Sequence, residues 1–215
     1  EDETVWKAIY GHYKPRGLTD EKLEDIGAGI LSIADRMDNI AGFVGKGIKI
    51  SSSKDPYGIR RDANAVIKIV IDLELELDLA PLIRLAALNF AKNDSDLEQN
   101  CKTIRELFAA RLENYLKDYL HYRYDVVNAV MGQDTMVIRD KFLKAQAVAK
   151  LVESGMIEPL VALHRRLKNI CGDSERCNFS EGLLKEKEEK ILSDVFKESK
   201  SRIDDLIMKK NFLQA

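Results

Sequence analysis

Two groups of cationic side chains have the composition that phosphate binding requires. The first surrounds one turn and the start of the helix after it: Lys46, Lys49, Lys54, Arg60 and Arg61. The second lies in the C-terminal half of the chain: His164, Arg165, Arg166 and Lys168. Guanidinium groups suit phosphate because their planar donors form paired hydrogen bonds, and phosphates supply much of the affinity in protein–nucleic acid complexes. The sequence therefore predicts two candidate phosphate-binding surfaces.

The same cations also have a purely structural explanation. Charge is common on solvated helix faces, and the first group has four acids within reach that can neutralise it internally. These acids are Asp35, Asp38, Asp55 and Asp62. Of the two adjacent arginines, Arg60 is the better placed to turn inward toward Asp35 or Asp38. The residues alone leave phosphate binding and internal pairing open.

Residues 34–39, ADRMDN, are similar to the last motif of the HD phosphohydrolases, which hold a divalent metal with His, a His-Asp pair and a later Asp. On that similarity Asp35 takes the place of the later ligand. A metal needs three or more converging ligands, and the chain has no His-Asp dipeptide. The sequence therefore predicts no bound metal, and a structural role for Asp35 and Asp38 in joining two helices.

Two other patterns are excluded as sites. Residues 42–47, GFVGKG, contain glycines and a lysine, but no Ser or Thr follows the lysine and no buried strand precedes the turn. A helix C-terminus also presents carbonyl oxygens, which repel phosphate. Cys171 and Cys177 are too far apart for a zinc knuckle, and no second pair of cysteines exists.

The first cationic group is positioned by two expected helices. An apolar stripe with steps of three and four predicts one helix, at Leu23, Ile26, Ile30, Ile33, Met37, Ile40 and Val44. Gly42, Gly45 and Gly47 end it. Asp55 is the expected N-cap of the next helix and Pro56 its first residue. That helix buries Ile59, Ala63, Val66, Val70 and Leu73, and its opposite face carries Arg60, Arg61, Asn64 and Lys68.

The rest of the chain is also expected to be helical. Residues 71–79, IDLELELDL, alternate as a strand would, but a lone strand lacks a partner, so we interpret them as a helix end and a connector. Thr19 and Asp96 are expected to cap helices, and Pro81 to begin one that runs through Phe90. In the C-terminal half, a helix is expected to bury Leu160, Leu163, Leu167 and Ile170. The sequence thus predicts an all-α fold in two packed helical units.

Composition limits the possible classes of protein. The chain has 215 residues, 45% of them hydrophobic, and a formal net charge of -2, so nucleic-acid binding must come from local basic faces. Three cysteines argue against a secreted disulfide scaffold and favour reduced thiols in the cytoplasm. We expect no membrane association. Because the chain starts at Glu1 without methionine, we expect it to be a fragment.

Four segments resemble the β subunit of the bacterial-type, two-subunit glycyl-tRNA synthetase. They are GHYKP at residues 11–15, SIADRMDNIAGFV at 32–44, GIKISSSKDP at 47–56 and GIRRDA at 58–63. A second match far downstream is EPLVALHRRLKNI at residues 158–170. The chain departs from the family where Ile50-Ser51 replaces Pro-Thr and where residues 164–166, His-Arg-Arg, replace Asn-Lys-Arg.

The resemblance implies that residues 1–123 are the later part of a degenerate HD-like domain and residues 124–215 the start of a helical anticodon-binding domain. It implies a role in tRNA recognition by Lys49, Lys54, Arg60, Arg61, Arg165, Arg166 and Lys168, and structural roles for Asp35, Asp38 and Asp55. The α subunit of the family forms a heterotetramer with β, holds the aminoacylation site and uses ATP and magnesium. The fragment is therefore expected to carry no cofactor and to be inactive alone.

Two alternatives to tRNA recognition remain open on the sequence. One is an HD-type metal-dependent phosphohydrolase acting on a nucleotide, and the missing His-Asp pair counts against it. The other is a helical interaction scaffold, and the two cationic groups count against that. Metal analysis separates the first alternative from the synthetase, and a gel-shift with tRNA separates the second.

Overall fold

A computed structural model describes residues 3–48, 55–133, 135–172 and 180–214. Within these ranges the regular secondary structure consists of helices alone. The β-type pairing found there is an isolated antiparallel bridge between Asp78 and Val137. The predicted all-α fold is confirmed. Within the described ranges, no helix combines the length and the apolar content needed to cross a lipid bilayer.

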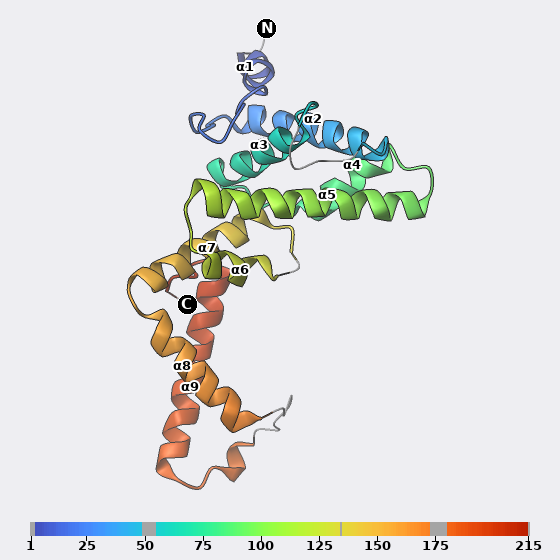
Figure 1. Ribbon diagram of the computed structural model, residues 1–215. Helices are drawn as coiled ribbons and strands as arrows, with labels where there is room; N and C mark the ends of the chain where they lie inside the picture. Colours follow the sequence, from blue (N-terminus) through green and yellow to red (C-terminus); the bar gives the residue numbers. More distant parts are fainter. Residues whose placement is uncertain (1–2, 49–54, 134, 173–179, 215) are drawn as a thin grey trace. The chain divides into compact units, whose positions relative to one another are not determined.

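The chain forms two compact units, Glu1–Ala145 and Gln146–Ala215. The first unit holds α1 (Glu3–Gly11), α2 (Ile26–Gly45), α3 (Ile59–Asp72), α4 (Leu79–Leu88), α5 (Asp94–Asn114), the π-helical turn η1 (Tyr115–Tyr119), α6 (Tyr124–Met131) and the start of α7 (Ile138–Glu153) (Figure 1). The second holds the rest of α7, α8 (Ile157–Cys171), the short η2 (Glu181–Leu183) and α9 (Lys187–Met208). The expected domain boundary between residues 123 and 124 stays a prediction.

Helix α3 is the centre of the first unit. It packs against α2 and against α5, while α4 packs against both α2 and α5 (Figure 1). From Ala65 to Val70 every residue of α3 is buried, as expected for a helix enclosed on all sides. Lys68 was expected on an outer face, but it is buried and its Nζ pairs with Asp72 Oδ2 at 2.9 Å. A long cation is tolerated there because the carboxylate one turn later neutralises it.

Helix α2 begins later than the sequence predicted. Its N-cap is Asp25, whose carboxylate accepts from the backbone N–H of Ala28, so Thr19 caps no helix. Its C-terminal half buries the expected stripe, whereas Ile26 and Ile30 are 60% and 59% exposed. Ile30 lines an open apolar groove between α2 and α4 instead of the core.

The other expected helix boundaries are partly correct. Residues 71–79 are a helix end and a connector, as predicted. Helix α4 begins at Leu79 behind the N-cap Asp78, two residues before Pro81. Helix α5 is capped by Asn93, whose side chain accepts from the N–H of Asp96, so Asp96 is not the cap. Asn and Asp are both good N-caps, so residue type alone does not decide between Asn93 and Asp96.

The connector before α4 is fixed to the start of α7. The Arg139 guanidinium pairs with Glu74, through Nη2 and Oε2 at 2.8 Å, and also with Glu76. The N–H of Leu79 donates to the carbonyl oxygen of Met136 at 3.3 Å. Residues about 60 apart in the chain are therefore joined by charge and by backbone hydrogen bonds.

In the second unit the expected burial is not observed. Leu160, Leu163, Leu167 and Ile170 of α8 are 47%, 53%, 52% and 81% exposed, so this stripe is not a core within the unit. Helix α9 likewise leaves Ile191 and Val195 about half exposed. The pattern predicted the helices correctly, but their apolar faces are not enclosed by the described part of this unit.

We expect Gly45→Ala to lower the free energy of unfolding by about 1–2 kcal/mol. A Cβ at Gly45 would lie 2.5 Å from Phe90 Cβ and 3.0 Å from the Phe90 carbonyl oxygen, and the backbone there cannot move aside easily. The effect is measurable by urea denaturation. Gly17→Ala is the control, because a Cβ at Gly17 meets nothing within 4 Å. Equal stability of the two variants would contradict the close packing of α2 on Phe90.

Candidate nucleic-acid interface

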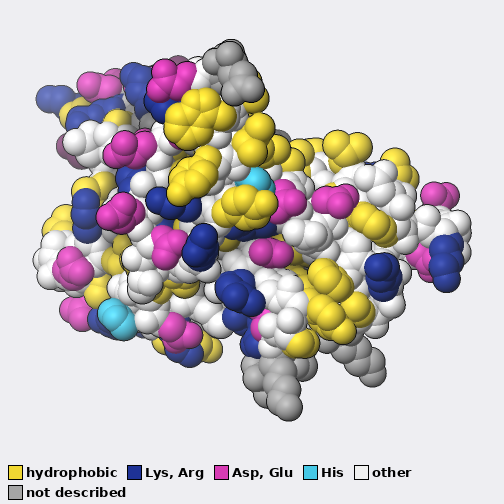
Figure 2. Space-filling model, turned by 90° about the horizontal axis from the view of Figure 1, so that it is seen from above, with side chains coloured by type: hydrophobic (Ala, Val, Ile, Leu, Met, Phe, Trp, Pro, Cys, Tyr) yellow, Lys and Arg dark blue, Asp and Glu magenta, His cyan; other side chains and the backbone are white. Residues whose placement is uncertain are grey.

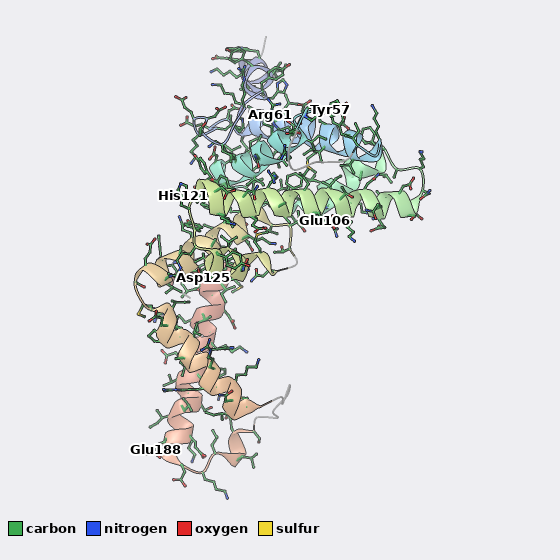
Figure 3. The ribbon with its side chains drawn as sticks, in the orientation of Figure 1. Tyr57, Arg61, Glu106, His121, Asp125 and Glu188 are labelled. Carbon is green, nitrogen blue, oxygen red and sulfur yellow. The ribbon has the colours of Figure 1, made fainter. Side chains whose placement is uncertain are left out.

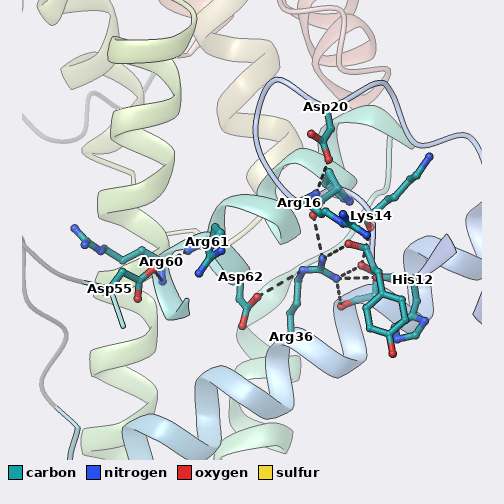
Figure 4. Close-up of polar contacts among 12 residues, drawn as sticks. His12, Lys14, Arg16, Asp20, Arg36, Asp55, Arg60, Arg61 and Asp62 are labelled. Atoms are coloured by element: carbon teal, nitrogen blue, oxygen red, sulfur yellow. Dashed lines mark hydrogen bonds and ion pairs between the residues drawn. The ribbon is translucent and has the colours of Figure 1, made fainter. Parts of the chain in front are cut away.

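Arg36 of α2 holds the segment that follows α1. Its side chain is buried, and its Nη1 donates to the carbonyl oxygen of His12 at 3.0 Å. Its Nη2 donates to the carbonyl oxygens of Tyr13 and Pro15 at 3.2 Å and 3.0 Å (Figure 4). Nη1 also contacts Ser32, one turn earlier on α2. One guanidinium therefore fixes residues 12–15 against α2, because its donors fan out in a plane.

Arg36 also joins α2 to α3. Its Nε lies 3.8 Å from Oδ1 of Asp62, in the first turn of α3. The sequence assigned this joining role to Asp35 and Asp38, and both of these side chains are exposed. Asp35 acts on Arg36 only as a nearby negative charge. A structural role for Asp35 and Asp38 stays a prediction, and the observed link between the two helices is the pair of Arg36 with Asp62.

A signal for Arg36 is present in the sequence, although motif reasoning passed over it. Ser32, Arg36 and Ile40 are spaced by four, so they lie on one helix face beside the apolar stripe. All three are buried. An arginine on a buried face must find several acceptors, and the turn-forming segment at residues 12–17 supplies carbonyl oxygens that no helix uses.

Burial shifts the pKa values of both Asp62 and Arg36. It raises the pKa of the Asp62 carboxyl to about 6, with Arg36 as the main opposing influence. Asp35 and Asp55 raise the Asp62 pKa further, and Arg61 lowers it. Burial also lowers the pKa of the Arg36 guanidinium, which nevertheless stays charged because its ordinary value is very high.

Asp55 bonds to the start of α3 from outside the helix. The helix begins at Ile59 rather than at the expected Pro56, because residues 56 and 57 form a turn first. Even so, the Asp55 carboxylate accepts from the N–H groups of Arg60 and Arg61 at 3.1 Å and 3.3 Å. It thereby satisfies two of the free donors that every helix N-terminus presents.

The two adjacent arginines of α3 point in different directions. The Arg61 side chain is exposed and lies close to Asp62, and its guanidinium folds back over Gly58 (Figures 3 and 4). Arg60 extends away from Asp62 (Figure 4). The pKa of Arg111 on α5 is lowered first by burial and then by the nearby charge of Arg60. Two neighbouring residues of a helix are separated by about 100° around its axis, so one surface does not contain both.

Arg61 contributes to a cavity of about 250 Å³. The cavity lies between the segment at residues 13–16, α2 and α3. Its lining is Tyr13, Pro15, Arg16, Arg36, Tyr57, Gly58, Arg61, Asp62 and Ala65. The Tyr57 ring stacks on Phe43, with the ring centroids 4.8 Å apart, and is 54% exposed. The structure thus brings Arg61 together with two cations, Arg16 and Arg36, that sequence reasoning did not select.

The remaining predicted cations are distributed as follows. Lys49 and Lys54 lie outside the described residues, and Lys46 is exposed after the end of α2. Arg165, Arg166 and Lys168 are all exposed on α8. Within the described parts of the chain, none of these three forms an ion pair. No structural evidence links the α8 group with the cavity, because the two belong to different compact units.

The face seen in Figure 2 has no dominant charge. In Figure 2, which looks down from the α1 side, acidic and basic side chains alternate among exposed hydrophobic ones. Any phosphate attraction must therefore be local. Among the described residues, no group of three or more His, Cys, Asp or Glu side chains is placed to hold a metal ion.

Comparison with known proteins identifies the family. The sequence profile described as "Glycyl-tRNA synthetase beta subunit" matches residues 1–132. Among curated relatives, the glycine–tRNA ligase beta subunit of Clostridioides difficile (strain 630) is 34% identical over 99% of this chain and 31% of its own length. Those of Acidobacterium capsulatum and Rickettsia canadensis (strain McKiel) are 32% and 31% identical, over 100% and 98% of this chain.

The chain spans about a third of the length of each of these relatives, at 31%, 32% and 31%. The profile covers α1 to α6, which contain Arg36, Asp62 and the cavity. The pairwise matches extend through α8 and its cations. The chain therefore belongs to the family of glycyl-tRNA synthetase beta subunits.

Proposed function

We propose that this chain is the tRNA-recognition part of a glycyl-tRNA synthetase beta subunit. The complete enzyme attaches glycine to its tRNA with ATP, and its aminoacylation site lies on the alpha subunit, which binds ATP and magnesium. On this proposal the chain carries no catalytic residue and is inactive alone. Its partners are tRNA and the alpha subunit, and its place is the cytoplasm.

The observation that carries the proposal is the cationic group on α8. Arg165 and Lys168 are three residues apart, so they are neighbours on the helix surface, whereas Arg166 is turned by about 100° around the axis from Arg165. All three are exposed, and within the described residues no carboxylate pairs with them. Unpaired cations on one helix repel each other, and RNA phosphates would relieve that repulsion.

The proposal also divides the chain into two domains. Residues 1–123 are the later part of an HD-like domain that has no metal, and residues 124–215 begin the helical anticodon-binding domain. The apolar stripe of α8, exposed among the described residues, suits a domain in which further helices pack on this face.

The test is a salt titration of tRNA affinity in the complete enzyme. A variant with Arg165→Gln, Arg166→Gln and Lys168→Gln should bind tRNA more weakly, and its slope of log affinity against log salt should fall by about 1–2 units. When a phosphate contact is lost, tRNA binding releases fewer counterions. The slope therefore reports the number of phosphate contacts rather than the stability of the fold.

The control removes the same charge elsewhere. Lys185, Lys187 and Lys190 are exposed in an acidic stretch near α9, and their change to glutamine should leave the slope unaltered. If the α8 variant keeps the salt slope of the unmodified enzyme, α8 does not contact RNA and this proposal is wrong in its main point.

A further inference from the structure

The cavity beside Arg36 has the dimensions and the polar lining of a site for a small charged group. Its volume of about 250 Å³ is below the ~300–1,000 Å³ typical of drug-sized ligands, and suits a group such as a phosphate. Three arginines and a single carboxylate line it. This excess of positive charge in one recess contrasts with the mixed charge of the surrounding surface (Figure 2).

The deepest cation of the cavity has an unused donor. Arg36 is 7% exposed, and its hydrogen bonds come from its two Nη atoms. Its Nε is buried and has no hydrogen-bond partner among the described residues. The nearest carboxylate oxygen, on Asp62, is 3.8 Å away, which is too far for a hydrogen bond. The charge of Arg36 is therefore only partly neutralised, so it adds to the attraction for an anion in the cavity that it lines.

The mouth of the cavity has what a nucleotide needs besides a phosphate site. Arg16 and Arg61 are exposed and carry planar donors suited to phosphate oxygens. Tyr13 and Tyr57 are 63% and 54% exposed beside them. Exposed aromatic rings next to cations are typical of sites that stack an unpaired base while holding its phosphate.

We propose that this cavity binds the phosphate group of a nucleotide, with Arg16 and Arg61 as its main ligands and the buried charge of Arg36 behind them. The phosphate belongs either to an RNA chain or to a free nucleotide. In the first case the inference deepens the proposed function, because it adds a second RNA contact in the HD-like part. In the second case it stands apart from tRNA recognition.

Binding in this cavity depends on pH through Asp62. This carboxyl faces Arg36 and Asp35 from α2, Arg61 from its own helix, Asp55 from the preceding turn, and Arg16 across the cavity. An incoming anion raises the Asp62 pKa further, so binding takes up a proton. Phosphate affinity is therefore higher at pH 5.5 than at pH 7.5, and the carboxyl in its protonated form can donate to a phosphate oxygen.

The experiment compares the complete enzyme with a variant carrying Arg16→Gln and Arg61→Gln. Both side chains are exposed, so the variant should fold. The probes are tRNA, AMP and inorganic phosphate, each measured by calorimetry at pH 5.5 and pH 7.5. We expect the variant to lose about tenfold in affinity for the probe that occupies the site. The control is Arg105→Gln, an exposed arginine of α5 that does not line the cavity.

The probes separate the two sources of phosphate. Affinity for tRNA alone that falls in the double variant supports an RNA phosphate, and affinity for AMP that falls in the same variant supports a free nucleotide. For the probe that binds, the difference in affinity between the two pH values should be smaller in Asp62→Asn; part of it remains for AMP and inorganic phosphate, because these groups themselves take up a proton at about pH 6–7. Equal binding by the unmodified enzyme and the double variant, for every probe, would overturn the inference.

Failure of this site and failure of the proposed function give different results. If the cavity is not a phosphate site, the double variant binds normally while the α8 variant still loses salt dependence. If instead α8 does not contact RNA, the α8 variant is normal while the cavity variant still loses affinity.

Discussion

Arg36→Met should lower the free energy of unfolding by about 3–5 kcal/mol, the cost of breaking a buried ion pair on one side. The change removes the donors that hold the carbonyl oxygens of His12, Tyr13 and Pro15, and it leaves the half-buried Asp62 beside an apolar side chain. Arg36→Lys should recover little of the loss, because one ammonium group cannot reach all the carbonyl oxygens that surround the edge of the guanidinium. Urea denaturation measures both.

A matched control is Arg105→Met on α5. Arg105 is exposed, so its loss should change the free energy of unfolding by less than about 0.5 kcal/mol. Hydrogen exchange should also show faster exchange of the amides at residues 12–17 in the Arg36 variant. Similar stability of the Arg36 and Arg105 variants would mean that the segment after α1 is held by other contacts.

Asp62 should make the protein less stable as the pH rises from 4 to 7. Its pKa is about 6 in the folded chain and 3.8 as an isolated group. Because the folded state binds the proton more tightly, the stabilisation is complete below about pH 4 and is lost as the pH passes through 6. Two units of pKa correspond to up to about 3 kcal/mol.

The measurement is the free energy of unfolding from pH 4 to 8, for the unmodified chain and for Asp62→Asn. The variant has no proton to lose at this position, so the difference between the two curves should change between pH 4 and 6.5 and be constant above about pH 7. Asp38→Asn, at an exposed position on α2, is the control. Parallel curves for the unmodified chain and Asp62→Asn would show that Asp62 titrates normally.

The sequence predicted the helices well, because helix periodicity depends on neighbouring residues. The stripe at Ile33, Met37, Ile40 and Val44 is buried, and the acidic alternation at residues 71–79 is a connector, as expected from the lack of a partner strand. The glycine after this stripe, Gly47, takes a positive φ of 71° and ends α2 as predicted.

The failures concern features that depend on the tertiary structure. Helix α3 appears amphipathic in sequence, yet its residues from Ala65 to Val70 are enclosed on all sides, so Lys68 required a partner that only the fold reveals. The stripe of α8 predicts burial, but the partner that would bury it is not in the described unit.

The candidate site shows the same division. Arg61 was selected from its position at a helix start, and it does line a cavity. Arg16 and Arg36 were not selected, because they come from a turn and from the middle of another helix. Only the folding of residues 12–16 onto α2 places them beside Arg61.

The attachment of Arg139 to the connector before α4 limits where this chain can be shortened. A version that stops at residue 132, where the family profile ends, would lack Arg139 and also Val137, the partner of Asp78. The acids at residues 74–78 would then repel one another at the entrance to α4. A stable excised unit should therefore run to about residue 145. The part of the chain that folds together is longer than the part that matches the family profile.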